Sequence, residues 1–381
     1  MEKACSLVKS FLEFCSNAKA QLEKFKQVQV VMGNPTCDLD SAVSALVYAL
    51  LCHEEAKLAG KNNTAVFPLL NIMKSDLCMK TEVIFWMKKN QVPVDLLLSR
   101  SDLDLKSLHK SGQLELILVD HHVLSPADSF LQKCIVEIYD HRPPEPGWEW
   151  RGKKTLLRVG SCATLIAKEV MQRQPSLLVQ DVCLLLYGPI LLDTACLSPN
   201  AGRTSQLDLD VISELDKHIG YAVKRDEIFQ NLLDARSDIS SLSPPQLLVK
   251  DMKIINGVPI CGLPILVQEF VKIPDVKMAL EEFCSQRKIS TLMIMGLTIV
   301  QNVIRRDLAV FSASEPIVGQ QLIEHLKKSS SPSLLLEPLH SVIPGLTLFK
   351  QGNIKASRKE IVPLVKTATE SIEKLGRECK P

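Results

Sequence analysis

The N-terminal part of the chain alternates short continuous apolar runs with longer stretches in which apolar residues recur at helical spacing. Continuous apolar runs are typical of strands buried on both faces of a parallel sheet, and the amphipathic stretches predict the helices that cover it. Strands are expected at 28–32, 65–72, 95–99, 114–119 and 134–139, and helices at 1–19, 41–56, 81–90, 103–111, 161–172, 177–197 and 207–218. This alternation predicts an α/β domain built on a parallel sheet.

The pattern changes after residue 236. A Ser-rich segment that ends in Pro-Pro, residues 237–245, is the best candidate for a linker. Beyond it, strands are expected at 253–256, 263–267, 290–295 and 309–312, and helices at 275–284 and 319–328. We therefore predict two domains, residues 1–236 with the parallel sheet and residues 246–381 with a smaller mixed α/β arrangement.

Composition and charge exclude several classes of partner. The formal net charge of the 381 residues is +2 with both signs mixed, which predicts no surface for nucleic acid or an anionic membrane. The longest apolar run, residues 182–197, is interrupted by Gly188 and Pro189 and carries an aspartate, so it predicts no membrane span. The twelve cysteines form no Cys-x-x-Cys pair and indicate buried thiols in a reducing compartment. We expect a cytoplasmic protein, with the nucleus as an alternative, and the sequence leaves the oligomeric state open.

Acidic residues and histidines follow four apolar runs of the first domain. These groups are Asp38 and Asp40, Asp120-His121-His122, Asp140-His141-Arg142, and Asp193. Each alone has an ordinary explanation, because an aspartate at a strand end often caps the next helix or turn. Together they favour a shared site, because ligands of parallel sheets bind beyond the carboxyl ends of the strands. Carboxylate and imidazole ligands without thiolates favour Mn²⁺ or Mg²⁺ over a structural zinc ion.

This set of motifs resembles the DHH phosphoesterase superfamily, which includes family II inorganic pyrophosphatases, yeast-type exopolyphosphatases and the animal Prune proteins. Gly-Asn-x-x-x-Asp-x-Asp-Ser at 33–41 is similar to its first motif, and the sequences at 119–122, 140–142 and 192–193 to the next three. Gly-Ser-Cys-Ala-Thr at 160–164 is similar to a helix start that would offer backbone N–H groups to phosphate. Asp-Met-Lys at 251–253 and Ser-Arg-Lys at 357–359 are similar to motifs of the DHHA2 domain.

The resemblance implies a DHH domain followed by a DHHA2 domain, with the active site in the cleft between them. It implies two divalent metal ions, Mn²⁺ or Mg²⁺, held by Asp38, Asp40, Asp120, His141 and Asp193. It also implies catalytic roles for Asn34, His121, His122 and Arg142, and phosphate binding by Lys253, Arg358 and Lys359. Two alternatives stay open. Ser357 and Glu360 can simply form a capping box, and one histidine of the pair at 121–122 can serve only as a neighbouring polar group.

Two residues depart from the pyrophosphatase pattern. Asn34 and Arg142 stand where family II pyrophosphatases have histidines, and Asp-His-Arg is the Prune pattern. Asparagine is a poorer transition-metal ligand than imidazole, so one ion is expected to bind loosely. Arg142 adds a permanent, bidentate donor to phosphate.

The resemblance therefore implies a Prune-type exopolyphosphatase that cleaves the terminal phosphate from tri- and tetraphosphate or nucleoside tetraphosphates. Two alternatives are a cyclic-nucleotide (cAMP) phosphodiesterase and a scaffold that regulates partners such as nucleoside diphosphate kinase. An oligonucleotide phosphodiesterase with a DHHA1 domain is disfavoured, because that domain uses a Gly-Gly loop and the chain has no Gly-Gly dipeptide.

Overall fold

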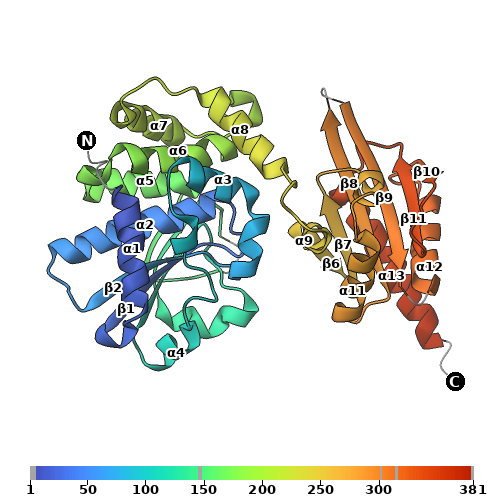
Figure 1. The fold of residues 1–381 in the computed structure, drawn as a ribbon, viewed down its shortest axis with the longest axis horizontal. Helices are drawn as coiled ribbons and strands as arrows, with labels where there is room; N and C mark the ends of the chain where they lie inside the picture. The colour runs from blue at the N-terminus through green and yellow to red at the C-terminus, as the bar shows by residue number, and fades with distance from the viewer. Residues whose placement is uncertain (1–5, 145–147, 301–302, 314–315, 379–381) are drawn as a thin grey trace. The chain divides into compact units, whose positions relative to one another are not determined.

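The computed structural model describes residues 6–144, 148–300, 303–313 and 316–378, and the chain divides into two compact units, Met1–Asp238 and Ile239–Pro381 (Figure 1). Residues 145–147, within the Pro-rich segment 143–148 that the sequence predicts to be a surface loop, lie outside the described residues. The helix α9, Pro244–Lys250, begins inside the predicted linker, so the segment without helix or strand is shorter than expected. Proline is well accommodated in the first turn of a helix, which explains why Pro-Pro opens α9 and does not extend the linker.

The first unit is built on a five-stranded, all-parallel sheet with the strand order β2-β1-β3-β4-β5. The strands are β1 (Gln27–Met32), β2 (Thr64–Leu69), β3 (Leu114–Val119), β4 (Ile135–Asp140) and β5 (Lys153–Leu156). β1 lies between β2 and β3, with Val28 opposite both Ala65 and Leu114. The predicted α/β class and its parallel sheet are confirmed. All five strands run the same way, so the segments that follow β1, β3 and β4 meet at one edge.

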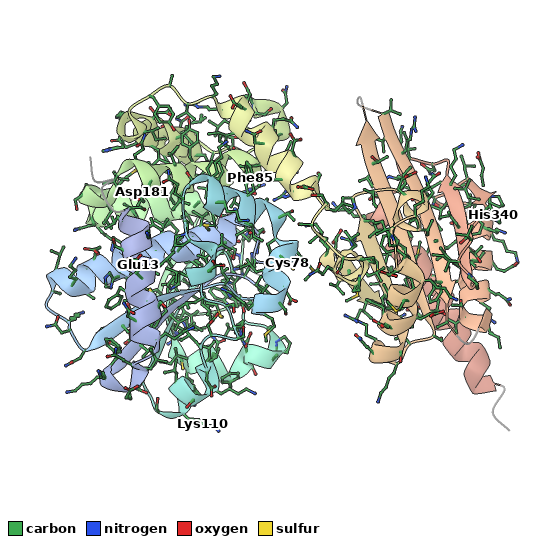
Figure 2. The ribbon with its side chains drawn as sticks, in the orientation of Figure 1. Glu13, Cys78, Phe85, Lys110, Asp181 and His340 are labelled. Carbon is green, nitrogen blue, oxygen red and sulfur yellow. The ribbon has the colours of Figure 1, made fainter. Side chains whose placement is uncertain are left out.

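Helices cover this sheet, and residues 39–52 of α2 are all buried. The α-helices are α1 (Leu7–Lys19), α2 (Leu39–Leu58), α3 (Thr81–Lys89), α4 (Leu105–Lys110), α5 (Cys162–Arg173), α6 (Gln180–Asp193), α7 (Gln206–Ile219) and α8 (Arg225–Ser237). α2 contacts β1 and β2, α5 contacts β4, and α6 packs against both helices. Side chains fill the space between these layers, and Lys110 projects from the surface of α4 (Figure 2). Burial of α2 on all sides explains why its first turn can carry a buried site.

The second unit contains a six-stranded sheet in the order β10-β11-β9-β8-β7-β6, in which only the β7–β8 pair is parallel. Its strands are β6 (Met252–Ile255), β7 (Val258–Leu263), β8 (Thr291–Val300), β9 (Val303–Ser312), β10 (Leu336–Leu339) and β11 (Leu346–Gln351). Its other helices are α10 (Val267–Phe270), α11 (Val276–Arg287), α12 (Pro316–Lys328) and α13 (Arg358–Glu378). The predicted mixed α/β arrangement of this part is confirmed.

Two predicted strands are wrong. Residues 95–99 contain a 3-10 turn, Val94–Leu96, and only Ser99 forms a bridge, to Leu70. The strand expected at 263–267 lies earlier, at β7, because Pro264 follows its last residue and has no N–H to continue the ladder. The short strands β5 and β10 and the polar helix α8 carry too little apolar pattern to have been predicted, and β11 was missed although its burial alternates.

In the part of the chain that the structure describes, no helix has the length and apolar character needed to cross a membrane. The cysteines in this part are all free thiols. Many of them lie in the core, including Cys162 at the start of α5. These thiols therefore contribute to packing and form no cross-links among the described residues.

Candidate active site

Three of the predicted metal ligands meet at the carboxyl edge of the parallel sheet. Asp40 lies in the first turn of α2, Asp120 follows β3 directly, and His141 follows β4 directly. One ligand atom from each lies within 4.8 Å of the other two, and both aspartates are buried. His141 Nε2 is 3.3 Å from Asp120 Oδ1 and 3.9 Å from Asp40 Oδ2. Two carboxylates and an imidazole at these distances can hold a divalent cation.

Asp40 is held by the N-terminus of α5. Its two carboxylate oxygens accept hydrogen bonds from the backbone N–H groups of Cys162 and Ala163, each at 2.7 Å. Ser44 Oγ donates to the same carboxylate at 3.2 Å. Burial raises the pKa of Asp40, and these donors and the partial positive charge of the helix end favour its ionised form. The N–H groups that the resemblance would offer to phosphate therefore orient a carboxylate in this structure.

Asp120 occupies a strained backbone position. Its φ of 59° lies in the left-handed region, which aspartate rarely adopts and which is common at functional sites. Its backbone N–H donates to Tyr139 O at 2.8 Å, and its Oδ1 lies 3.3 Å from Arg142 Nη2. Burial and the negative charge of Asp40 raise the pKa of Asp120 well above its ordinary value. This turn therefore directs the Asp120 carboxylate toward the cluster. Without a bound cation, the ionised form of this carboxylate is unfavourable.

Asn34 reaches the site as a hydrogen-bond donor. Its Oδ1 accepts from the backbone N–H groups of Thr36 and Cys37, at 2.8 and 3.0 Å, and this fixes which amide atom is oxygen. Its Nδ2 donates to Asp120 Oδ2 at 2.7 Å. With its oxygen already bound to the backbone, Asn34 presents an NH₂ group to the cluster, and in this structure it orients Asp120.

His141 has its tautomer set by the backbone. Its Nδ1 lies 3.1 Å from the carbonyl oxygen of Val159, which can only accept, so Nδ1 carries a proton and Nε2 faces the carboxylates. Burial lowers the pKa of His141, but the hydrogen bond with Asp120 and the charge of Asp40 outweigh it and raise the pKa to about 9. In the metal-free protein His141 is therefore an imidazolium that partly balances the two carboxylates.

His121 and His122 are buried beside this cluster and each uses only one ring nitrogen. His122 Nδ1 bonds Asp140 Oδ2 at 2.5 Å, and His121 Nδ1 donates to Val119 O at 3.0 Å. Both Nε2 atoms lack a hydrogen-bond partner among the described residues. Burial lowers the pKa of His121, so its ring is neutral and its Nε2 is an acceptor. Buried polar atoms without partners are costly, which is typical of groups reserved for a ligand or substrate.

Asp38 and Asp193 complete the acidic set, but with different surroundings. Asp38 caps α2, its Oδ1 accepting from the N–H of Ser41 at 3.1 Å, so the capping explanation for this residue is correct. Asp193 is the last residue of α6. Burial and the charges of Asp40, Asp38 and Asp120 raise the pKa of Asp193 well above its ordinary value. These four carboxylates therefore share one electrostatic environment, and that donor set fits divalent cations. Metal ligation by Asp38 and Asp193 stays a prediction.

The three predicted phosphate-binding cations all lie in the second unit, on β6 and at the start of α13. Arg358 Nη1 and Nη2 donate to Asp251 O and Oδ1 at 2.9 and 2.8 Å, which joins the start of α13 to the chain just before Lys253 in β6. Lys359 follows Arg358 and is exposed. Ser357 also forms the capping interaction with Glu360, at 2.6 Å from Oγ to Oε2. That these cations face the acidic cluster stays a prediction.

Several residues that position the ligands of the site were not predicted from the sequence. Ser44, Val159 and the N–H groups of Cys162 and Ala163 orient Asp40 and His141, and no motif signalled those pairings. The Gly-Ser-Cys-Ala-Thr segment did indicate a helix start near the site. The group that this helix start binds, Asp40, could not be predicted, because backbone N–H groups are the same in every residue type except proline.

Comparisons with known proteins agree with this arrangement. A DHHA2 domain family model matches residues 230–368. The chain is 34% identical over 363 residues to human exopolyphosphatase PRUNE1, covering 93% of this chain and 79% of the human protein. It is 26% identical to a putative exopolyphosphatase of Schizosaccharomyces pombe, covering 90% of this chain and 91% of the yeast protein.

A solved structure shows the same fold. The Methanococcus jannaschii putative family II inorganic pyrophosphatase superimposes with a TM-score of 0.50 at 21% identity, covering 90% of this chain and 99% of that one. The identity and coverage shared with the human protein, together with the DHHA2 match, are sufficient to assign the family. The chain belongs to the Prune-type exopolyphosphatase family of the DHH phosphoesterase superfamily, with a DHHA2 domain in its C-terminal part.

Proposed function

We propose that this protein is a metal-dependent phosphohydrolase that removes the terminal phosphate from short-chain polyphosphates such as tri- and tetraphosphate or nucleoside tetraphosphates. The observation that carries this proposal is the cluster of Asp40, Asp120 and His141, whose ligand atoms lie within 4.8 Å of one another. The family supports the reaction class, because the related human and yeast proteins are named exopolyphosphatases. The site accordingly takes Mn²⁺ or Mg²⁺.

The residues of the site would bind two metal ions with different affinities. Asp40, Asp120 and His141, together with Asp193, would hold the tighter ion. Asp38 would contribute to the binding of a second ion. This ion would bind more weakly, because the amide oxygen of Asn34 already accepts hydrogen bonds from backbone N–H groups and is not offered as a ligand. When bound, divalent ions activate the attacking water and neutralise charge on the phosphoryl oxygens. Asn34 holds Asp120 in place during the reaction through its 2.7 Å hydrogen bond.

His121 and His122 would handle protons and substrate oxygens. The pairing of His122 Nδ1 with Asp140 leaves Nε2 free to exchange a proton with the departing phosphate, as in other Asp-His pairs. The neutral Nε2 of His121 can accept a hydrogen bond. Arg142 has a side chain that is 50% exposed, so its guanidinium can turn from Asp120 toward a phosphate oxygen at little desolvation cost.

Cations of the DHHA2 domain would bind the remainder of the phosphate chain. Arg358 is anchored by Asp251, which orients its guanidinium. Lys253 and Lys359 are exposed lysines near this anchor. Their charges would offset the charge that builds on the leaving phosphate. Under this proposal a longer phosphate chain would contact more of these cations than pyrophosphate would, so we expect tri- and tetraphosphate to be the substrates.

The test is a panel of phosphate-release assays on pyrophosphate, tri- and tetraphosphate, a nucleoside tetraphosphate and cAMP, with Mn²⁺ and Mg²⁺ in turn. We expect Mn²⁺-dependent phosphate release from tri- and tetraphosphate, and loss of this activity in Asp193→Asn. Asp210→Asn, the same change at an exposed position of α7, is the matched control and should keep full activity. Purified protein that leaves all phosphoanhydrides intact with either metal would refute the proposal.

The same panel separates the alternatives. Cleavage of cAMP without phosphoanhydride cleavage would identify a cyclic-nucleotide phosphodiesterase that uses the same cluster. A scaffold for nucleoside diphosphate kinase would still bind that partner in the inactive Asp193→Asn variant, because the substitution removes one charge without altering the surface of the helices. Loss of partner binding together with activity would argue against an independent scaffold.

A further inference from the structure

Asp208, in the first turn of α7, is fully buried although it lies outside the acidic cluster. Its Oδ2 accepts from the backbone N–H of Gly160 at 2.9 Å and from the N–H and hydroxyl of Ser205, each at 2.7 Å. Its Oδ1 accepts from the hydroxyl of Thr164 at 2.6 Å. Capping α7 needs only the bonds with Ser205, so the two bonds to the α5 segment require a separate explanation.

Those two bonds hold the start of α5 next to the N–H groups that bind Asp40. Gly160 and Thr164 flank Cys162 and Ala163, whose N–H groups hold the Asp40 carboxylate at 2.7 Å. Ser161, the N-cap residue, makes no side-chain cap bond. Two carboxylates therefore fix the first turn of α5, Asp40 of the candidate site and Asp208 outside it.

The same junction also contacts the end of α6. A Cβ atom placed on Gly160 would lie 2.4 Å from Thr194 Cγ2 and 3.1 Å from Asp208 Oδ2, so only glycine allows this approach. Thr194 directly follows Asp193, and its hydroxyl donates to Ile190 O at 2.6 Å while accepting from the N–H of Leu197 at 3.1 Å. The segment that donates to Asp40 and the segment that follows Asp193 therefore touch where Gly160 meets the buried Thr194.

We propose that Asp208 is a positioning residue: through Gly160 and Thr164 it sets the start of α5, and thereby the places of Asp40 and Asp193 relative to each other. This role rests on the proposed metal-dependent function. Asp208 touches neither substrate nor metal in this scheme. It acts by holding the backbone donors that orient a ligand, and loss of such outer partners commonly weakens metal binding about 10- to 100-fold.

Two single substitutions test this role, because each removes one hydroxyl that donates to Asp208. Thr164→Val removes the side-chain bond to α5 with little change in volume and leaves the bond from the Gly160 N–H. Ser205→Ala removes only the hydroxyl bonds that cap α7. Calorimetric titration with Mn²⁺ should show affinity about tenfold weaker in Thr164→Val. Ser205→Ala should bind Mn²⁺ like the unsubstituted protein, and Thr164→Ser should restore binding. Equal losses in Thr164→Val and Ser205→Ala would overturn the proposal, since they would indicate general destabilisation.

A second readout is independent of metal and activity. Amide hydrogen exchange of Cys162 and Ala163 in the metal-free protein should be faster in Thr164→Val and in Asp208→Asn than in Ser205→Ala. Unchanged exchange at these amides would refute the positioning role. If the unsubstituted protein binds no Mn²⁺, the proposed function fails, and this exchange experiment still decides whether Asp208 positions α5.

Discussion

The proton on His141 must leave before a metal ion can use Nε2. In the metal-free site the hydrogen bond with Asp120 and the charge of Asp40 outweigh burial and raise the pKa of His141 to about 9. At pH 7 only about 1% of the molecules then carry the neutral imidazole that a metal requires. We therefore predict that binding of one Mn²⁺ ion releases about one proton at pH 7, and that apparent affinity rises about tenfold for each pH unit between 6 and 8.

The same proton contributes to the stability of the metal-free fold, with a definite sign. The folded-state pKa lies above the ordinary value of 6.5, so the ion pair stabilises the metal-free protein fully below pH 6.5. This contribution is lost as the pH rises through 9. The His141 side chain is only 17% exposed, and a pKa rise from 6.5 to about 9 corresponds to about 3 kcal/mol of free energy of unfolding.

Isothermal titration with Mn²⁺ at pH 7 measures the proton release directly, when it is repeated in two buffers with different ionisation enthalpies. The difference in observed heat gives the number of protons released per ion. His141→Gln should bind Mn²⁺ more weakly and show no pH dependence of this origin. His340→Gln, at an exposed position of the second unit, should behave like the unsubstituted protein. Buffer-independent heats, or an affinity constant from pH 6 to 8, would refute the reasoning.

Three further outcomes are expected. Lys359→Gln should raise the KM for triphosphate about tenfold, because it removes the proposed charged contact to phosphate. Calorimetric Mn²⁺ binding should stay unchanged, because the substitution does not touch the cluster. A parallel loss of Mn²⁺ binding would contradict this role. Although burial opposes it, the hydrogen bond from Lys19 lowers the pKa of Asp102 to about 2, so this pair stabilises the fold above about pH 4 and loses that effect as the pH falls toward 2. Chemical unfolding should accordingly show Asp102→Asn to be less stable at pH 7 by about 1 kcal/mol, with a difference that vanishes near pH 2. Trp86→Ala should lower the free energy of unfolding by about 4 kcal/mol in urea, because the ring is fully buried and its Nε1 donates to Leu185 O, and a loss below 1 kcal/mol would be inconsistent with that burial.

The architecture was largely predictable because its signal is local. A buried parallel strand needs a continuous apolar run, and a covering helix needs apolar residues at helical spacing, so both leave a pattern within a few residues of each other. Where the pattern is weak, as at β5 and α8, prediction failed. Within 95–99, residues 97–99 are buried although only Ser99 forms a bridge, and burial alone produces the same apolar pattern as a strand.

The meeting of Asp40, Asp120 and His141 could also be anticipated, because carboxyl ends of parallel strands share one edge. The hydrogen-bond partners of the individual atoms of these groups could not be predicted. The Asn34 oxygen is taken by two backbone N–H groups, and the helix start expected to bind phosphate holds Asp40. Sequence spacing says nothing about which donor lies within 3 Å of which acceptor.

By itself, the order of apolar runs and charged residues determined the two-domain α/β organisation, the family resemblance and the identity of the chemical groups. Only the tertiary structure decided that His141 is protonated in the metal-free site, which amide atom of Asn34 faces the site, and that Asp208 accepts hydrogen bonds from the start of α5. The physical reason is the distance along the chain over which each interaction acts. Hydrophobic periodicity acts between neighbours along the chain, whereas hydrogen bonding and charge interaction depend on distances that exist only after segments far apart in sequence have packed together.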